Sequence, residues 1–273
     1  MSRFEDVRML SAAEAANVVA MLDPGLNSWL RYALDRDDLS LFTTSERGLV
    51  GIATRHARLS NPISEDDARS LGRATASMQI DEAWGDPRCV RAFVQARADA
   101  AEWSLVHPSH EMIKVAPAVP RAVPGEPKRV SELVGADSEV PPPFDVWMVA
   151  FFDEALRGHR NRPIVGADEL WAWVVDGEPR AMAGEILRGA DSMRVVTVYT
   201  PMDHRGRGFA GALVATMTER AIGCGRAHVT LSVAKDNTCA RRAYERAGFR
   251  KVFEAEMWAL SERSARPACR TSS

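Results

Sequence analysis

The alternation of hydrophobic and polar positions is most regular in the second half of the chain. Residues 193–200 are the most β-branched stretch of the sequence, which favours a strand. The apolar positions 209, 213, 214, 217 and 221 that follow recur at helical spacing. Two earlier apolar runs, 170–175 and 180–187, flank Asp176-Gly177-Glu178-Pro179, which is typical of a hairpin turn. A strand, a helix and a strand are predicted last, over 228–233, 237–247 and 249–260.

This order of elements predicts the fold class. Antiparallel strands come first and a β-α-β crossover follows, so we expect an α+β fold, an α/β sandwich with a mixed, mostly antiparallel sheet flanked by helices. In the first half the pattern is less specific. There it predicts helices over 9–22, 28–34, 64–77 and 86–101, hairpin strands over 41–44 and 49–56, and a strand near 112–115.

Proline marks the boundary between the halves. Residues 116–127 contain four prolines in twelve positions, so they are expected to be extended and irregular. A second cluster, Pro141-Pro142-Pro143, precedes a helical pattern that begins at Phe144. We therefore divide the chain into an N-terminal half, a proline-rich linker, a C-terminal domain and a polar tail expected to be disordered, over residues 1–117, 118–127, 128–260 and 261–273.

Composition excludes several classes of protein. The longest unbroken apolar run, Val146 to Phe152, has seven residues, whereas a membrane span needs about 18. The first ten residues lack the apolar region of a secretory signal, and the four cysteines form no C-x-x-C pair, so we expect a cytoplasmic protein with reduced thiols. His107, His110 and Glu111 surround Pro108, which disrupts helical spacing, and we expect no metal there.

Charge is distributed unevenly along the chain. Its 35 basic and 37 acidic side chains give a net charge of −2, but residues 201–251 hold ten basic against four acidic ones. This local excess suits a small polyanion. No aromatic and basic stripe accompanies it, so nucleic acid is not an expected partner.

The segment from Val198 to Gly211 carries the most informative motif. It predicts a strand, a glycine-rich loop and a helix N-terminus, whose unpaired N–H groups can bind a phosphate. Gly206-x-Gly208-x-x-Gly211 also satisfies the dinucleotide fingerprint, but residues 201–205 separate it from the strand and the preceding strands look antiparallel. A dinucleotide-dependent oxidoreductase is therefore the third-ranked hypothesis.

Two motifs resemble those of the GCN5-related N-acetyltransferase (GNAT) superfamily. Arg205-Gly206-Arg207-Gly208-Phe209-Ala210 is similar to its acetyl-CoA motif Q/R-x-x-G-x-G/A, and Asn237 followed by Tyr244-Glu245-Arg246-Ala247-Gly248-Phe249 is similar to its Asn...Tyr-x-x-x-Gly-Phe ending. The resemblance covers about 128–260. The first half looks like the degenerate, cofactor-free half of bacterial two-part acetyltransferases.

The resemblance implies roles for individual positions. It implies pantetheine pairing along the strand end, pyrophosphate binding along the loop that Arg205 begins, a contact of Asn237 near the thioester, and protonation of the leaving thiolate by Tyr244 as general acid. The cofactor-binding positions are Val198, Tyr199, Thr200, Arg205, Gly206, Arg207, Gly208, Phe209, Ala210 and Asn237.

The general base is less clear from the sequence. The superfamily often has a glutamate on the fourth strand, but residues 193–200 contain no acid. Glu185 on the preceding strand is the candidate base, and Asp203 and His204 are alternatives.

The leading hypothesis is an N-acetyltransferase that uses acetyl-CoA, or another acyl-CoA, to acylate the primary amine of a small molecule or amino-acid-like substrate. The alternative is a non-catalytic acyl-CoA sensor. The N-terminal half is expected to shape one wall of the acceptor cleft, which Trp84, Trp103 and Trp147 would line unless they belong to the core. A homodimer is a further possibility.

Overall fold

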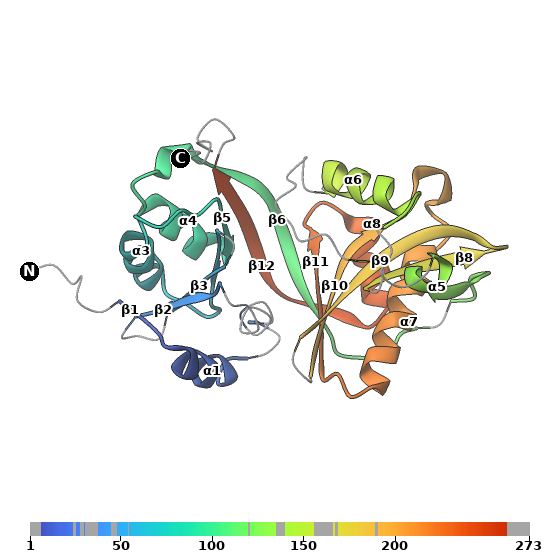
Figure 1. Ribbon diagram of the computed structural model, residues 1–273, viewed down its shortest axis with the longest axis horizontal. Helices are drawn as coiled ribbons and strands as arrows, with labels where there is room; N and C mark the ends of the chain where they lie inside the picture. The colour runs from blue at the N-terminus through green and yellow to red at the C-terminus, as the bar shows by residue number, and fades with distance from the viewer. Residues whose placement is uncertain are drawn as a thin grey trace, which may run out of the picture. The chain divides into compact units, whose positions relative to one another are not determined.

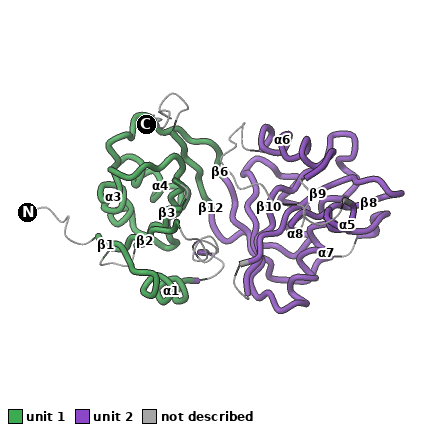
Figure 2. Tube along the Cα trace, in the orientation of Figure 1, with its two compact units in different colours: residues 1–22, 33–108, 254–273 green, residues 23–32, 109–253 purple. Residues whose placement is uncertain are grey.

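The structure is a computed structural model of the chain (Figure 1). It describes residues 7–23, 26–27, 30, 38–44, 48–53, 55–119, 121–134, 140–155, 166, 169–188 and 191–260. The expected tail 261–273, and all but one residue of the expected helix 28–34, lie outside the described residues. The chain divides into two compact units (Figure 2). Unit 1 holds residues 1–22, 33–108 and 254–273, and unit 2 holds residues 23–32 and 109–253.

Unit 2 contains the sheet that carries the motifs. Its strand order is β6-β11-β10-β9-β8-β7. Strands β7 to β10 pair antiparallel, β10 pairs parallel with β11, and β11 pairs antiparallel with β6. The strands are β6 (Trp103–Lys114), β7 (Glu126–Arg129), β8 (Leu170–Val175), β9 (Glu178–Arg188), β10 (Ser192–Tyr199) and β11 (His228–Ala234). The expected mixed, mostly antiparallel sheet is thereby confirmed.

Helices cover both faces of this sheet. Met193 and Val195 of β10 point into a core with α7 (Phe209–Gly223) and α8 (Thr238–Arg246). Val196 belongs to a second core beneath α6 (Phe144–Ala155). A short helix, α5 (Val130–Val134), precedes α6 along the chain. The division follows from strand geometry, because successive side chains of a strand point to opposite faces.

Unit 1 repeats this arrangement. Its strands are ordered β1-β2-β3-β4-β5-β12; β4 and β5 are parallel, and the pairs β1–β2, β2–β3, β3–β4 and β5–β12 are antiparallel. The predicted hairpin is part of a run of three strands, because a further strand follows it. The elements are β1 (Arg8–Met9), α1 (Ala12–Ala20), β2 (Ser40–Thr43), β3 (Leu49–Ala53), β4 (His56–Leu59), α3 (Glu65–Ala74), β5 (Glu82–Gly85), α4 (Pro87–Gln95), the 3-10 turn η2 (Ala100–Glu102) and β12 (Phe249–Leu260).

The two units exchange their last strands. In each unit the sixth strand comes from the other half of the sequence: β6 enters the sheet of unit 2 and β12 the sheet of unit 1. The contiguous ranges 1–117 and 128–260 therefore describe halves of the sequence, whereas the compact units cross that division. Both exchanged strands have twelve residues, which is long enough for each to contribute to both units.

The linker is more ordered at its end than the prolines predicted. Residues 126–129 form the edge strand β7, where Pro127 is tolerated. Upstream, the Val119 N–H donates to the carbonyl of Arg246 at 2.8 Å, and the Trp173 indole donates to the carbonyl of Pro124 at 2.8 Å. Upstream of β7 the linker is thus fastened to unit 2 by single hydrogen bonds, and at β7 it joins a ladder with β8.

Other expectations concern membrane contact and aromatic residues. Among the described residues, no helix combines the length and the apolar composition needed to cross a bilayer. Trp84 and Trp103 are buried, as a core role requires, whereas Trp147 is half-buried and contacts Tyr199. Cys89 is a buried free thiol, and burial raises its pKa to about 11.

Candidate functional site

A fork opens between the parallel strands β10 and β11. Their pairing runs from Ser192 opposite His228 to Val195 opposite Leu231 and then ends. Beyond it, the β10–β9 register shifts between Val196 and Tyr199, and Thr197 has a φ of 51°. This bulge turns the end of β10 away from a regular ladder, so backbone polar groups on its β11 side are available to an extended ligand.

The fork leads into the uncapped N-terminus of α7. A 3-10 turn η3 (Met202–His204) and the loop from Arg205 connect β10 to the helix. The N-cap is Gly208 with a φ of 90°, and no side chain in the described part of the chain caps it. The first turn carries no acid. Open N–H groups at the positive end of the helix dipole form an anion site of the size of a phosphate.

The proline-rich linker lies against this turn. A Cβ placed on Gly208 would lie 3.3 Å from Nη1 of Arg121 and 3.4 Å from Cγ2 of Val123. Gly208 therefore combines a left-handed backbone with a tight neighbour, and a side chain there would be strained. Arg121 brings a further positive charge to the turn. No sequence motif indicated this role, because Arg121 lies in the proline-rich linker.

Arg205 braces the loop. Its Nε donates to the carbonyl of Thr200 at 2.9 Å, and its Nη2 donates to Glu154 at 2.6 Å. Tyr199 donates its hydroxyl to the same carboxylate at 3.1 Å, and its ring lies under the guanidinium. Burial and Glu154 raise the pKa of Tyr199. The Arg205 side chain is thus engaged away from the helix N-terminus, and Glu154 is a loop-bracing residue that no sequence motif indicated.

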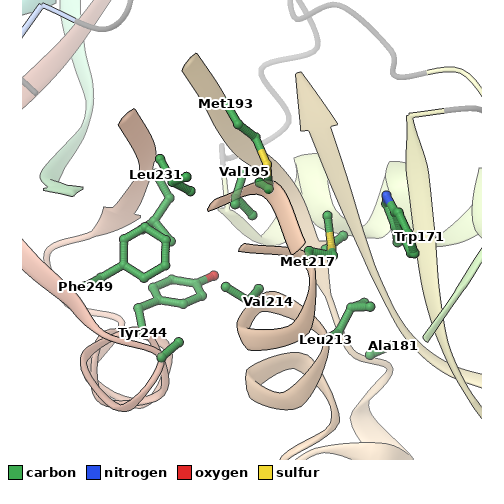
Figure 3. Close-up of a cluster of buried hydrophobic side chains, with 14 of the residues drawn as sticks. Trp171, Ala181, Met193, Val195, Leu213, Val214, Met217, Leu231, Tyr244 and Phe249 are labelled. Carbon is green, nitrogen blue, oxygen red and sulfur yellow. The ribbon is translucent and has the colours of Figure 1, made fainter. Parts of the chain in front are cut away.

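Tyr244 lies in the core between α7, α8 and the sheet. Its ring lies beside Phe249, at 6.3 Å between centroids, and next to Val214 (Figure 3). Burial raises the pKa of its phenol, so the hydroxyl stays protonated well above neutral pH. It can therefore act as a hydrogen-bond donor wherever an anion forms within its reach.

The remaining residues of the second motif shape the end of α8. Asn237 is the N-cap, and its Oδ1 accepts the Ala240 N–H at 3.0 Å, which leaves its amide nitrogen as the donor for a ligand. Gly248 has a φ of 89°, and a Cβ there would lie 1.9 Å from the carbonyl oxygen of Ala116. Glycine is required at this position because two backbones meet.

The three candidate bases have different surroundings. Glu185 is buried on β9 and accepts a hydrogen bond from Arg129 at 2.6 Å, while Arg129 stacks on Trp171. This ion pair holds the carboxylate on β9, and removing either partner would leave a buried charge. His204 has a ring nitrogen 3.3 Å from Arg180, and Asp203 is exposed on η3.

The structure thus brings most of the predicted positions to one place. Residues 198–200 and 205–210 meet where β10 ends and α7 begins. Tyr244 and Asn237 lie on α8, which packs against α7. Glu185 is held by Arg129 instead. Within the described ranges, no group of three or more His, Cys, Asp or Glu side chains is arranged to hold a metal ion.

Two sequence comparisons match part of the chain. The family model of FR47-like proteins matches residues 174–259. A mycothiol acetyltransferase of Corynebacterium aurimucosum is 42% identical over 119 residues, which is 44% of this chain and 36% of that protein, so the chain spans about a third of this curated relative.

Solved structures show the same fold at low identity. A Drosophila melanogaster protein has a TM-score of 0.63 at 13% identity over 95% of this chain and 100% of that one. A GCN5-related N-acetyltransferase from Sphaerobacter thermophilus has a TM-score of 0.55 at 14% identity, covering 94% and 96%. Residues 174–259 therefore match the FR47-like family model, both motifs resemble those of the GCN5-related N-acetyltransferase superfamily, and the fold is that of a solved GCN5-related N-acetyltransferase.

Proposed function

We propose that this protein transfers an acetyl group from acetyl-CoA to the primary amine of a small molecule or amino-acid-like substrate. The observation that carries the proposal is the fork between β10 and β11, which leads directly into the uncapped glycine N-terminus of α7. A long ligand with amide groups at one end and phosphates at the other fits that combination.

Each part of acetyl-CoA has a counterpart in the chain. The free edge of residues 198–200 would pair with the pantetheine amides, and the N–H groups from Arg207 to Ala210 would hold the pyrophosphate. Gly206 and Gly208 would let the phosphates approach the backbone, and Arg121 would add charge. Asn237 would donate its amide near the thioester. Another acyl-CoA would use the same contacts.

The reaction in this site is a direct attack. The amine nitrogen forms a bond to the thioester carbonyl carbon, the β10 amides stabilise the oxyanion, and the carbon–sulfur bond then breaks. The leaving thiolate takes a proton from Tyr244, whose raised pKa keeps that proton available, and solvent returns it. The amine loses one proton, so atoms and charge balance.

Calorimetric titration with acetyl-CoA, together with the melting temperature, tests the binding step. We expect a stoichiometry of one and a stabilised protein. A panel of amino acids, amino sugars, polyamines and peptides, read by release of the CoA thiol, then tests transfer. The similarity to a mycothiol acetyltransferase adds mycothiol-related amines to the panel. No binding and an unchanged melting temperature would refute the proposal.

A non-catalytic acyl-CoA sensor is the second candidate. It is favoured by the absence of an acid on β10 and by the engagement of Glu185 with Arg129. The two candidates differ in turnover. If acetyl-CoA binds tightly and Tyr244→Phe abolishes transfer to any amine while its affinity is preserved, the sensor is excluded.

Two further properties belong to the proposal. We expect the protein in the cytoplasm of a bacterium, and we propose that it can form a homodimer. Sedimentation equilibrium tests the second property, and a single species of 30.0 kDa would contradict it.

A further inference from the structure

A row of polar side chains crosses three strands of unit 2 on the face opposite α7. Leu231 of β11 and Met112 of β6 are paired and belong to the α7 core. Because side chains alternate, the next pair, Ser232 and Glu111, points to the other face. On β10, Arg194 also points there, since its neighbours Met193 and Val195 face α7.

These three side chains are joined through the glutamate. Arg194 Nη2 donates to Oε2 of Glu111 at 3.0 Å, and the Ser232 hydroxyl donates to Oε1. Arg194 also contacts the Ser232 oxygen. Glu111 is buried, with 3% of its surface exposed. Glu111 from β6 and Arg194 from β10 bring opposite charges to this row, and β11 supplies the Ser232 hydroxyl, with His228 four positions earlier on the same face and 3.8 Å from Asp191.

The row lies at the mouth of the fork. The parallel pairing of β10 and β11 ends at Val195 and Leu231, and Ser232 is the next residue of β11. A thioester bound along the free end of β10 would therefore have Ser232 beside it on this face. Tyr244 belongs to the core on the opposite face, so an acid and a base would flank the thioester from two sides.

Two hydroxyls next to the row have no hydrogen-bond partner. Thr230 of β11 and Ser109 of β6 are 2% and 0% exposed, and neither side-chain oxygen is hydrogen-bonded. Both point to the face of Glu111, because each lies two positions along its strand from Ser232 or Glu111. Buried hydroxyls are nearly always satisfied, so this face is suited to a polar ligand or water.

We propose that Glu111 is the proton acceptor of acetyl transfer, that it is reached through the hydroxyl of Ser232, and that Arg194 positions its carboxylate. This inference rests on the proposed function and names its missing base. As the nitrogen bonds to the carbonyl carbon, its proton passes to Ser232 Oγ while the Ser232 proton passes to Glu111 Oε1. The thiolate receives its proton separately from Tyr244, so one proton is taken up and one is released.

With this assignment, the first half of the sequence contributes the proton acceptor of the reaction. Glu111 is on β6, the exchanged strand, and stands where it can replace the acid that β10 lacks. The proline at 108 had argued against metal binding by His107, His110 and Glu111, and the structure places His110 and Glu111 on opposite faces of β6. His110 pairs with Val233 of the α7 core, whereas Glu111 does not face that core.

Glu111→Gln is the first test, with Glu256→Gln as its matched control. Glu256 is also buried on an exchanged strand and accepts a hydrogen bond from Arg91 at 2.8 Å, but it lies in unit 1. With acetyl-CoA and the best amine of the panel, we expect Glu111→Gln to lower kcat/KM by about 10²- to 10³-fold. Acetyl-CoA affinity, measured by calorimetry, should stay within about twofold, and Glu256→Gln should keep its turnover.

The pH profile separates a base from a structural residue. Without the base, the proton of the attacking nitrogen has to pass to hydroxide from solution. The deficit of Glu111→Gln should therefore shrink as the pH rises, by up to about tenfold per pH unit. A deficit that is constant with pH, or equal in Glu256→Gln, would overturn the proposal.

If Glu111→Gln does not fold, Ser232→Ala tests the proposal in its place. It keeps the ion pair of Glu111 with Arg194 and removes the relay, so kcat should fall with little change in KM, and Ser232→Thr should restore it. Arg194→Lys should keep part of the activity. Wild-type turnover in Ser232→Ala refutes the relay, whereas wild-type protein that binds no acetyl-CoA refutes the proposed function itself.

Discussion

The helix that follows the parallel strand begins differently in the two units. In unit 1, α3 has Ser64 as N-cap, whose hydroxyl accepts the Asp67 N–H, and its first turn holds Glu65, Asp66 and Asp67. In unit 2, α7 begins at Gly208 with neither a side-chain cap nor an acid among the described residues. Carboxylates in its first turn stabilise the helix dipole of α3, whereas the N-terminus of α7 is open to the anionic ligand that we propose for it.

The next helix of each unit shows the same contrast. Asp86 caps α4 and Asn237 caps α8. Seven residues later, α4 has Phe93 and α8 has Tyr244, both buried. Unit 1 therefore keeps the packing of unit 2 without its hydroxyl. Unit 1 thus shares the topology and core packing of unit 2 but lacks the open helix start and the buried hydroxyl on which the proposed function of unit 2 depends.

Tyr244→Phe should have the largest effect on turnover. It gives α8 the phenylalanine that α4 has at the corresponding position. We expect kcat to fall by about 10²- to 10³-fold with unchanged acetyl-CoA affinity, since only the proton donor is lost. Steady-state kinetics and calorimetry measure the two quantities. Phe93→Tyr is the control and should lower the melting temperature without affecting turnover. Turnover of Tyr244→Phe within twofold of wild type would remove Tyr244 from the mechanism.

Ala210→Asp should make the start of α7 resemble that of α3. A carboxylate at this position repels the pyrophosphate, so acetyl-CoA affinity should fall by about 10- to 100-fold, which is ~1.4 to 2.8 kcal/mol. The melting temperature should not fall, because an acid in the first turn suits the dipole. Ala210→Asn has a similar size without the charge, and an equal loss of affinity there would show that size, not charge, is responsible.

Arg121→Ala should have a smaller effect on the same site. Removing one exposed cation beside Gly208 should weaken acetyl-CoA binding by about three- to tenfold, and the loss should diminish at high salt. Titrations at two salt concentrations measure it, with Arg69→Ala in α3 as the control. A salt-independent loss would indicate packing of the linker rather than charge.

Glu219 should contribute the smallest effect, on stability. Lys114, 2.8 Å away, and the Ala118 N–H hold the pKa of Glu219 below its usual 4.5. Because the folded pKa is the lower one, the unfolded chain binds the proton first as pH falls. The stabilisation is complete above the unfolded pKa and is lost as pH decreases through the folded pKa. The melting temperatures of Glu219→Gln and wild type should differ at pH 7 and converge in acid.

The sequence predicted the second half more accurately than the first. From 170 onward each expected element is present, since turns, glycines and apolar periods are local signals. The strand expected near 112–115 begins instead at Trp103. Its buried polar residues and Pro108 hide the alternation, and the partners of Glu111, Arg194 and Ser232, are distant in the sequence.

The candidate site was also only partly predictable. The loop from Arg205 to Ala210 and the place of Tyr244 came from motifs whose residues are close in sequence. Arg121, Glu154 and Glu111 had no such signal, because each meets its partners through tertiary structure. Glu185, chosen for its position on the preceding strand, is engaged by Arg129 on β7, which no local pattern indicates.

By itself the sequence determined the order of elements, the fold class and the glycine-rich start of α7, because these depend on residues within a few turns of one another. Only the tertiary structure decided the exchange of β6 and β12 and the row at the mouth of the fork. Glu111 is 83 positions from Arg194 and 121 from Ser232. Strand pairing brings such distant residues together. Because they are then buried, their charged groups and hydroxyls form hydrogen bonds with one another.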